Sequence, residues 1–284
     1  MDRLVRQNRT KKVGAVIQAR VSSSRLAGKV LLSLPHGSEV SVCGHIIRRL
    51  KKAKSVDAII VATTSNPCDD KVVDVANSEG VEYYRGAEED VLARFFEAAQ
   101  KYRLDEIIRI TGDNPCIDYA LIDRVVRAHL QEDNDYTVTR QYPTGINVEV
   151  LSSKVLKVVY ENAKQPKERE HLTLYIETHP EAFKVSEKKA PNNYRRSDIR
   201  VTLDTEEDYA LLNCIFEFLY EKDNYFGIDK LISLYQQKPW LAVINNKVGQ
   251  KKVFETLEDE LAEAVHVLDL QDLKRAKEFL ASYL

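Results

Sequence analysis

A basic, hydroxylated stretch, residues 18–30, follows the first hydrophobic run of the chain. Its side chains suit the binding of phosphate groups. Small residues such as Gly28 let backbone N–H groups approach a ligand, while the cations supply charge complementary to phosphate. The stretch is not a Walker A loop, because Lys29 is followed by Val30 and the spaced glycines are missing. We interpret it as a triphosphate-binding loop, with a solvated basic loop as the alternative. Its candidate residues are Gln18, Ala19, Arg20, Ser24, Arg25 and Lys29.

A carboxylate lies in the segment TGDNP, residues 111–115, which directly follows another apolar run. An acid at the end of a strand, beside a triphosphate loop, suggests a magnesium ligand, because Mg²⁺ prefers few carboxylates together with water and phosphate oxygens. Asp113 could instead be a turn or N-cap residue before a helix that starts near Tyr119, although Asp118 could fill that role. The sequence leaves both interpretations of Asp113 open.

A second carboxylate of this kind is Asp204, which follows the apolar run 199–203. Thr205 and Asp208 have the spacing of a capping box at the start of the next helix. That arrangement leaves Asp204 outside the cap and facing the end of the expected strand. Asp204 is therefore a candidate for the second magnesium carboxylate.

Two other polar clusters have simpler explanations. Residues 133–135 (DND) match the D-x-D pattern of metal-dependent glycosyltransferases, but polar residues between a helix and a strand usually form a loop. Residues 167–171 (KEREH) could contribute to a site, but i, i+4 charge pairs on a solvated helix face account for most such clusters.

The hydrophobic pattern of the first half predicts an α/β sheet that positions these loops. Short apolar runs are typical of buried strands, and segments with helical spacing alternate with them. Repeated strand–helix units favour a three-layer, mostly parallel sheet, in which ligands lie beyond the carboxyl ends of the strands. The loops that begin at Gln18, Thr63, Arg85 and Gly112 all fall at that edge. The expected strands are 13–17, 58–62, 81–84 and 106–111, and the expected helices are 42–54, 90–102, one from 69–70 and one from Tyr119.

The second half is less regular, and its composition changes near the end. Strands are expected over 136–140, 146–151 and 199–203, and helices over 153–162, from Lys167 and after Thr205. Residues 253–284 have the pattern of one or two charged amphipathic helices, suited to packing or oligomerisation. We predict a basic N-terminal tail over 1–11, a main domain over 12–248 and a C-terminal helical extension over 249–284.

Composition excludes several classes of function. The 284 residues are 44% hydrophobic and 30% charged, and the net charge of −2 gives no general attraction to nucleic acid or to acidic membranes. No apolar run approaches the ~20 residues that cross a bilayer. The four cysteines are widely spaced and form no C-x-x-C pair, which favours reduced thiols and a cytoplasmic location over a zinc site or a disulfide framework.

In order along residues 12–248, the loop motifs resemble those of cytidylyltransferases that activate acidic sugars. These are the CMP-Kdo and CMP-sialic acid synthetases, especially the spore-coat polysaccharide branch. Ala27 stands where the typical pattern has proline. The motifs are IQAR at 17–20, SRLAGKVL at 24–31, VATT at 61–64, YRG at 84–86, DVLAR at 90–94, TGDNP at 111–115, PTG at 143–145, VE at 148–149, REH at 169–171 and LDT at 203–205.

The resemblance implies roles for individual residues. The phosphates of CTP would bind Arg20, Arg25 and Lys29, and Mg²⁺ would bind Asp113 and Asp204. Arg20, Lys29, Asp113 and Asp204 would together be the catalytic residues. Ala62 and Thr63 would lie against the base, and Arg85 near the nucleotide. The acceptor sugar would contact Arg94, Glu149, Arg169, Glu170 and His171.

The same resemblance implies a nucleotide-diphospho-sugar transferase-like fold and a reaction. Such an enzyme couples CTP to an acidic sugar and releases pyrophosphate, as a homodimer with residues 136–190 as its acceptor and dimerisation insertion. Three alternatives stay open: a nucleotidylyltransferase that uses another NTP or a phosphorylated acceptor, a glycosyltransferase of similar fold, and a catalytically silent nucleotide-binding protein.

Overall fold

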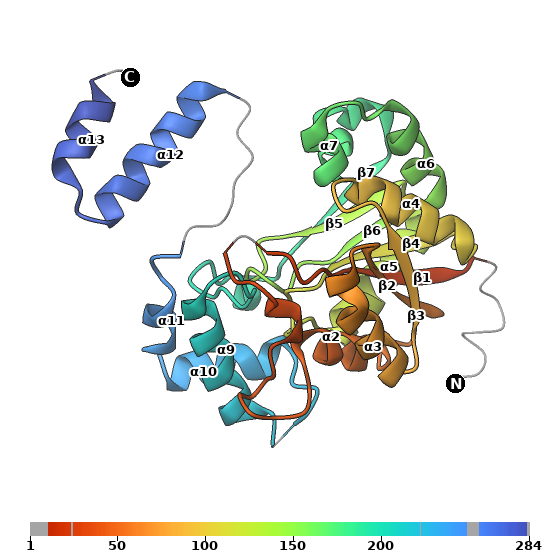
Figure 1. Cartoon of the computed structure of the whole chain (residues 1–284), viewed down its shortest axis with the longest axis horizontal. Helices are drawn as coiled ribbons and strands as arrows, with labels where there is room; N and C mark the ends of the chain where they lie inside the picture. The colour runs from red at the N-terminus through yellow and green to blue at the C-terminus, as the bar shows by residue number, and fades with distance from the viewer. Residues whose placement is uncertain (1–10, 24, 222, 249–255, 283–284) are drawn as a thin grey trace. The chain divides into compact units, whose positions relative to one another are not determined.

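The computed structural model describes residues 11–23, 25–221, 223–248 and 256–282, and the chain forms two compact units (Figure 1). The larger unit is Met1–Ile244 and the smaller is Asn245–Leu284. The larger unit contains the sheet and every candidate site residue within the described ranges.

The larger unit is built on a seven-stranded mixed sheet with the order β3-β2-β1-β4-β6-β5-β7. Only β6 runs antiparallel to its neighbours, which confirms the mostly parallel sheet expected from the sequence. The strands are β1 (Val13–Gln18), β2 (Ala58–Thr64), β3 (Glu82–Gly86), β4 (Glu106–Thr111), β5 (Tyr136–Arg140), β6 (Glu149–Ser152) and β7 (Val185–Lys189).

Alternating side chains of the strands fill two cores, one on each face of the sheet. In β1, Val13, Ala15 and Ile17 belong to one core, and Val16 belongs to the other. The first core includes α2 (Val42–Leu50), α3 (Asp70–Ser78), α5 (Tyr119–Glu132), α9 (Glu206–Leu219), α10 (Ile228–Gln237) and α11 (Leu241–Ile244). The second includes α4 (Val91–Lys101), α6 (Ser153–Asn162) and α8 (Leu174–Thr178), with α7 (Pro166–Glu170) packed against α4 (Figure 1). This arrangement confirms the three-layer α/β fold.

Four short 3₁₀ helices complete the described part of the larger unit. They are η1 (Lys29–Leu31), η2 (Pro67–Asp69), η3 (Pro180–Ala182) and η4 (Asn192–Tyr194). Of these, η1 begins at the candidate phosphate-binding Lys29, and η2 leads into α3.

The strand expected over residues 199–203 is wrong. Arg200 forms one isolated bridge with Thr144, and the segment continues as extended chain outside the sheet. Its backbone bonds go to loops, because Val201 N donates to Thr144 O and Leu203 N donates to Asp113 O, both at 2.8 Å. Its apolar residues are nevertheless buried. The hydrophobic run therefore indicates burial and not pairing in the sheet. As a consequence, the segment delivers Asp204 to the carboxyl end of β4.

The edge strand β7 was not expected from the sequence. Its residues VSEKK are mostly charged or polar, and none of the five is buried, so no hydrophobic alternation marks it. Charged side chains are typical of edge strands, where they discourage pairing with another chain.

The smaller unit contains two helices in its described residues, α12 (Leu257–Leu270) and α13 (Lys274–Ala281). This agrees with the expected one or two amphipathic helices. Across the described ranges of the whole chain, no helix has the length and apolar character needed to span a bilayer.

Candidate active site

The candidate site lies where the carboxyl ends of β1, β2 and β4 meet. Gln18 is the register partner of Ala62 on one side and of Thr111 on the other. The loops after β1 and β4 diverge there, and this topological switch point is where open α/β sheets bind ligands. Gly112 N donates to Gln18 O at 2.8 Å, and a Cβ on Gly112 would lie 2.7 Å from that oxygen, so this close approach requires glycine.

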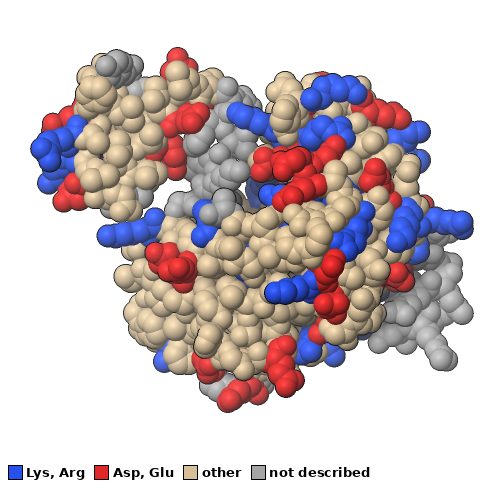
Figure 2. Space-filling model, viewed as in Figure 1, with Lys and Arg blue, Asp and Glu red and all other residues tan. Residues whose placement is uncertain are grey.

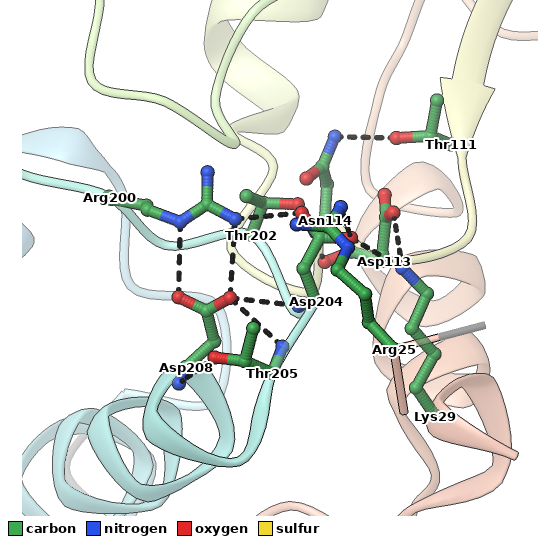
Figure 3. A network of polar contacts seen from close by, with 10 residues as sticks. All are labelled: Arg25, Lys29, Thr111, Asp113, Asn114, Arg200, Thr202, Asp204, Thr205 and Asp208. Atoms are coloured by element: carbon green, nitrogen blue, oxygen red, sulfur yellow. Dashed lines mark hydrogen bonds and ion pairs between the residues drawn. The ribbon is translucent and has the colours of Figure 1, made fainter. Parts of the chain in front are cut away.

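The side chain of Lys29 joins the two candidate magnesium carboxylates (Figure 3). Its Nζ donates to Asp113 Oδ2 and to Asp204 Oδ1, at 2.8 Å in both cases. The three side chains are between 13% and 22% exposed. The phosphate loop, the end of β4 and the segment before α9 therefore converge at one point, and two hydrogen-bond lengths at most separate the two carboxylate oxygens.

Asp204 has two further cationic partners (Figure 3). Arg25 Nη2 lies 2.9 Å from Oδ1, the oxygen that Lys29 also contacts. Arg200 Nη2 donates to the other oxygen, Oδ2, at 2.7 Å, and the same guanidinium contacts Asp208 at 3.1 and 3.2 Å. Both oxygens of Asp204 are thus held by charge-assisted hydrogen bonds.

These contacts keep Asp204 and Lys29 ionised. Burial by itself raises the pKa of Asp204, but the hydrogen bond and charge of Lys29, with Arg25 and Arg200, bring that pKa below its usual value. Burial likewise lowers the pKa of Lys29, whereas Asp113 and Asp204 bring the pKa of this ammonium above its usual value. Asp204 and Lys29 therefore carry full charge near neutral pH.

The turn that begins α9 fixes the position of Asp204. Thr205 is the N-cap and Asp208 closes the capping box, as the sequence indicated. The fully buried Asp208 accepts hydrogen bonds from the backbone N–H groups of Asp204 and Thr205, at 2.9 and 3.2 Å. Asp204 itself lies outside the cap.

The alternative role of Asp113 as a helix cap is wrong, because Asp118 occupies that position. The Asp118 carboxylate accepts from the N–H groups of Ala120 and Leu121, in the first turn of α5, at 2.8 and 3.0 Å. Asp113 is left to contact Lys29.

The residues at this point fit a magnesium ion. Asp113 and Asp204 are two adjacent carboxylates with hard oxygen donors. Among the residues that the structure describes, no three His, Cys, Asp or Glu side chains gather into a metal cluster. A pair of carboxylates leaves most of the coordination shell to water and phosphate oxygens, which suits Mg²⁺.

The rest of the candidate phosphate-binding loop is held by Glu88. Arg20 Nη1 lies 3.5 Å from Glu88 Oε1, and Ser22 Oγ donates to the same oxygen at 2.7 Å. Gly28 has φ +69° and its N–H donates to Val21 O at 2.9 Å, which closes the loop just before Lys29. Ser24 lies outside the described residues.

Asp69 joins the loops that follow β1 and β2. Its fully buried carboxylate accepts a hydrogen bond from Val21 N at 2.6 Å. The other oxygen accepts from the backbone N–H and the hydroxyl of Thr64. The sequence placed Asp69 only at a helix start, whereas the structure makes it the anchor between two loops of the site.

Replacing Asp69 with alanine is expected to lower the free energy of unfolding by about 2–4 kcal/mol, because it leaves two backbone N–H groups and a hydroxyl without their acceptor. Urea denaturation measures this change. The neighbouring Asp70→Ala is the control, since its carboxylate is 63% exposed and pairs with Arg85, so a loss below about 1 kcal/mol is expected. Equal losses in the two variants would contradict the anchoring role.

Two of the candidate acceptor residues hold the loop between β3 and α4. Arg94 in α4 is almost completely buried and donates to the carbonyl oxygens of Ala87 and Glu88. Arg169 in α7 pairs with Asp90, with Nη2 2.6 Å from Oδ2. Both cations belong to the side of the sheet that α4 covers.

The other candidates come from separate elements, β6, α7 and β3. Glu149 accepts from Arg109 Nη1 at 3.0 and 3.1 Å, across the register pair that the two residues form between β4 and β6. Glu170 ends α7, and His171 follows as its C-cap. Arg85 Nε donates to Thr64 O at 2.9 Å, and its Nη2 donates to Asn66 O at 2.8 Å. The ligand-binding roles of these residues stay predictions.

Several buried polar atoms at this edge have no hydrogen-bond partner. They include Gln18 Oε1, Thr63 Oγ1 and Asn114 Oδ1. Ala62, beside Thr63, is completely buried and accepts from Ala19 N through its carbonyl oxygen at 3.3 Å. Because buried polar groups are normally paired, such atoms indicate a place where water or a ligand completes the bonding.

The D-x-D segment lies away from this site. Asp133 is the C-cap of α5, and its carboxylate accepts from Lys11, which precedes β1, at 3.0 Å. Asp135 accepts from Lys184 N at 2.9 Å, directly before β5. Since β5 runs in the same direction as β1 and β4, these carboxylates lie at the amino-terminal edge of the sheet, opposite Asp113. This removes the feature on which the glycosyltransferase alternative depended.

Sequence reasoning did not single out Arg200, and it missed the contact of Asp208 with this cation. The available signal was an arginine inside an apolar run with acids four and eight residues later. Interpreting residues 199–203 as a sheet strand concealed it.

A phosphate-complementary loop after β1 and two carboxylates at the same edge of the sheet are the groups that a nucleotidyltransferase requires. The sequence profile described as cytidylyltransferase matches residues 15–256, so the chain belongs to the cytidylyltransferase family. This confirms the resemblance seen in the motifs.

Individual relatives agree with this assignment. The chain is 38% identical to an uncharacterized protein of Methanocaldococcus jannaschii (87% of this chain, 100% of the relative) and 34% identical to the spore coat polysaccharide biosynthesis protein SpsF of Bacillus subtilis (79% and 94%). It is 30% identical to a 3-deoxy-manno-octulosonate cytidylyltransferase of Geotalea daltonii over 52% of this chain and 56% of that one. A cytidylyltransferase structure from Leptospira borgpetersenii has a TM-score of 0.75 at 32% identity, over 86% and 100% of the two chains.

Proposed function

We propose that this enzyme transfers CMP from CTP to a hydroxyl group of an acidic sugar, with Mg²⁺ held by Asp113 and Asp204. The observation that carries the proposal is the Lys29 ammonium between these two carboxylates, at the end of a loop that also presents Arg20 and Arg25. The acidic acceptor is supported by the similarity to a 3-deoxy-manno-octulosonate cytidylyltransferase, and a role in surface polysaccharide synthesis by the similarity to SpsF.

In this reaction the sugar oxygen bonds to the α-phosphorus of CTP, the bond from that phosphorus to the pyrophosphate oxygen breaks, and the hydroxyl proton leaves to water. Lys29, Arg20 and Arg25 would neutralise the triphosphate and the negative charge that grows on the leaving pyrophosphate. A magnesium ion bound by the two carboxylates would supply a Lewis acid for the phosphate oxygens. The remaining work is positioning, for which the buried contacts of Asp69, Asp208 and Gly112 provide a fixed frame.

A pyrophosphate-release screen tests the substrate assignment. It combines the enzyme and Mg²⁺ with each of the four NTPs and a panel of nonulosonic and octulosonic acids. We expect release with CTP and one acidic sugar, and its loss when EDTA is added. Release only with another NTP or a phosphorylated acceptor would overturn the substrate assignment in favour of a different nucleotidylyltransferase.

We also propose that the enzyme is a cytoplasmic homodimer that uses residues 136–190 as its dimerisation insertion. All four cysteines are free, which suits a reducing compartment. The insertion supplies three strands of the sheet, β5, β6 and the edge strand β7. Basic and acidic side chains are interspersed over the face seen in Figure 2. Light scattering after size exclusion would test the dimer.

A further inference from the structure

The cluster around Asp204 has equal numbers of positive and negative groups (Figure 3). Three carboxylates meet three cations through hydrogen bonds and ion pairs, all in described residues. The members are Asp113, Asp204, Asp208, Arg25, Lys29 and Arg200. Because the charges cancel, the carboxylates offer a bare cation little net attraction as long as their present partners stay in place.

The cations on the two oxygens of Asp204 are held very differently. Lys29 and Arg25 both contact Oδ1, and both belong to the phosphate loop. Arg25 is 36% exposed, and the Lys29 ammonium is at the end of a flexible stem. Arg200 contacts Oδ2, is 11% exposed, and is also bound to the fully buried Asp208 through two of its nitrogens. One side of Asp204 can therefore change partners while the other cannot.

We propose that Lys29 and Arg25 are exchangeable cations that move from Oδ1 of Asp204 to the phosphates of the incoming nucleotide, while Arg200 is a positioning residue that holds Asp204 in place. The consequence is that Asp113 and Asp204 become available to a divalent cation only together with the nucleotide. This inference rests on the proposed function, because it assigns the order in which that same site is filled.

The chemistry of the groups favours this exchange. Ammonium and guanidinium groups bind phosphate oxygens as well as carboxylates. A triphosphate carries several negative charges, whereas Oδ1 of Asp204 carries only part of a single negative charge. Removing Lys29 from between Asp113 and Asp204 leaves two like charges close together, which a divalent cation neutralises. Arg200 has no comparable freedom, since leaving its place would break its ion pair with the fully buried Asp208.

Binding of Mn²⁺, followed by the electron paramagnetic resonance signal of the free ion, tests the proposal without catalysis. The wild-type chain is titrated with Mn²⁺ alone and with CTP present, after correction for Mn²⁺ bound by free CTP. We expect CTP to tighten the binding at least about tenfold. In Lys29→Met, Mn²⁺ alone is expected to bind about tenfold more tightly than to wild type, because the competing ammonium is gone.

Three more variants complete the test. Arg25→Gln changes a side chain that is 36% exposed and is expected to tighten binding of Mn²⁺ alone by a smaller factor. This variant keeps the test possible if Lys29→Met does not fold. Arg200→Met is expected to weaken binding both with and without CTP. Arg196→Gln removes an ion pair with Asp198 outside the cluster and serves as the control without effect.

The outcomes separate this inference from the proposed function. Equal Mn²⁺ affinity with and without CTP in wild type, or no gain in Lys29→Met and Arg25→Gln, would overturn the exchange while leaving a metal-dependent CTP enzyme intact. No Mn²⁺ binding even in the presence of any NTP would overturn the proposed function, and the exchange with it.

Discussion

Replacing Asp113 with asparagine is expected to lower the rate of pyrophosphate release by roughly a hundredfold to a thousandfold, while the protein stays folded. The change removes one of two charged candidate metal ligands, and losing a charge-stabilising group of a transition state typically costs about 10²–10³ in rate. The fold should persist, because the structural contact of this residue is made by its main chain, where Asp113 O accepts from Leu203 N at 2.8 Å. Pyrophosphate release measured beside a circular dichroism melting curve gives both results.

Asp133→Asn is the matched control for that experiment. Asp133 belongs to the D-x-D segment, and its carboxylate is 84% exposed and pairs with Lys11 at the opposite edge of the sheet. We expect this variant to keep its activity, since its ion pair is exposed and far from the strand ends that carry the site. Full turnover by Asp113→Asn, or a comparable loss in Asp133→Asn, would show that the active site has been placed at the wrong edge.

The positions of the candidate site loops could be predicted from the sequence because the first half of the fold is regular. Parallel strands separated by helices all have their carboxyl ends at a common edge. Once the strands 13–17, 58–62 and 106–111 are identified, the loops that follow them are therefore predicted to lie close together. The capping box of Thr205 and Asp208 was equally predictable, since it depends on four consecutive residues, and it correctly left Asp204 outside the helix.

The contacts that complete the site could not be predicted, because they join segments that are distant in sequence. The bond from Asp69 to Val21 and the bonds from Lys29 to Asp113 and Asp204 depend on how loops close over the sheet. The irregular path of residues 199–203 is a further case. Burial makes these residues apolar whether or not they pair as a strand, so hydrophobicity alone could not distinguish a strand from extended chain at the sheet edge.

Asp208→Asn is expected to reduce both stability and activity. The buried carboxylate accepts hydrogen bonds from Arg200 and from the backbone N–H groups of Asp204 and Thr205. An asparagine of the same size replaces one acceptor oxygen with a donor and removes the charge that balances Arg200. The free energy of unfolding should fall by about 2–4 kcal/mol, as measured by urea denaturation.

The same substitution should lower activity roughly 10–100-fold at a temperature where the variant is fully folded. The reason is that Asp208 holds Asp204, the candidate metal ligand, in position. Because that effect concerns metal affinity, raising the Mg²⁺ concentration should restore part of the lost rate, whereas a purely structural defect would not respond. Glu207→Gln is the control. Its exposed side chain lies next to Asp208 in the first turn of α9, and the change should leave the magnesium dependence unaltered. If the activity lost in Asp208→Asn does not recover at higher Mg²⁺ concentration, the role of Asp208 is limited to capping the helix.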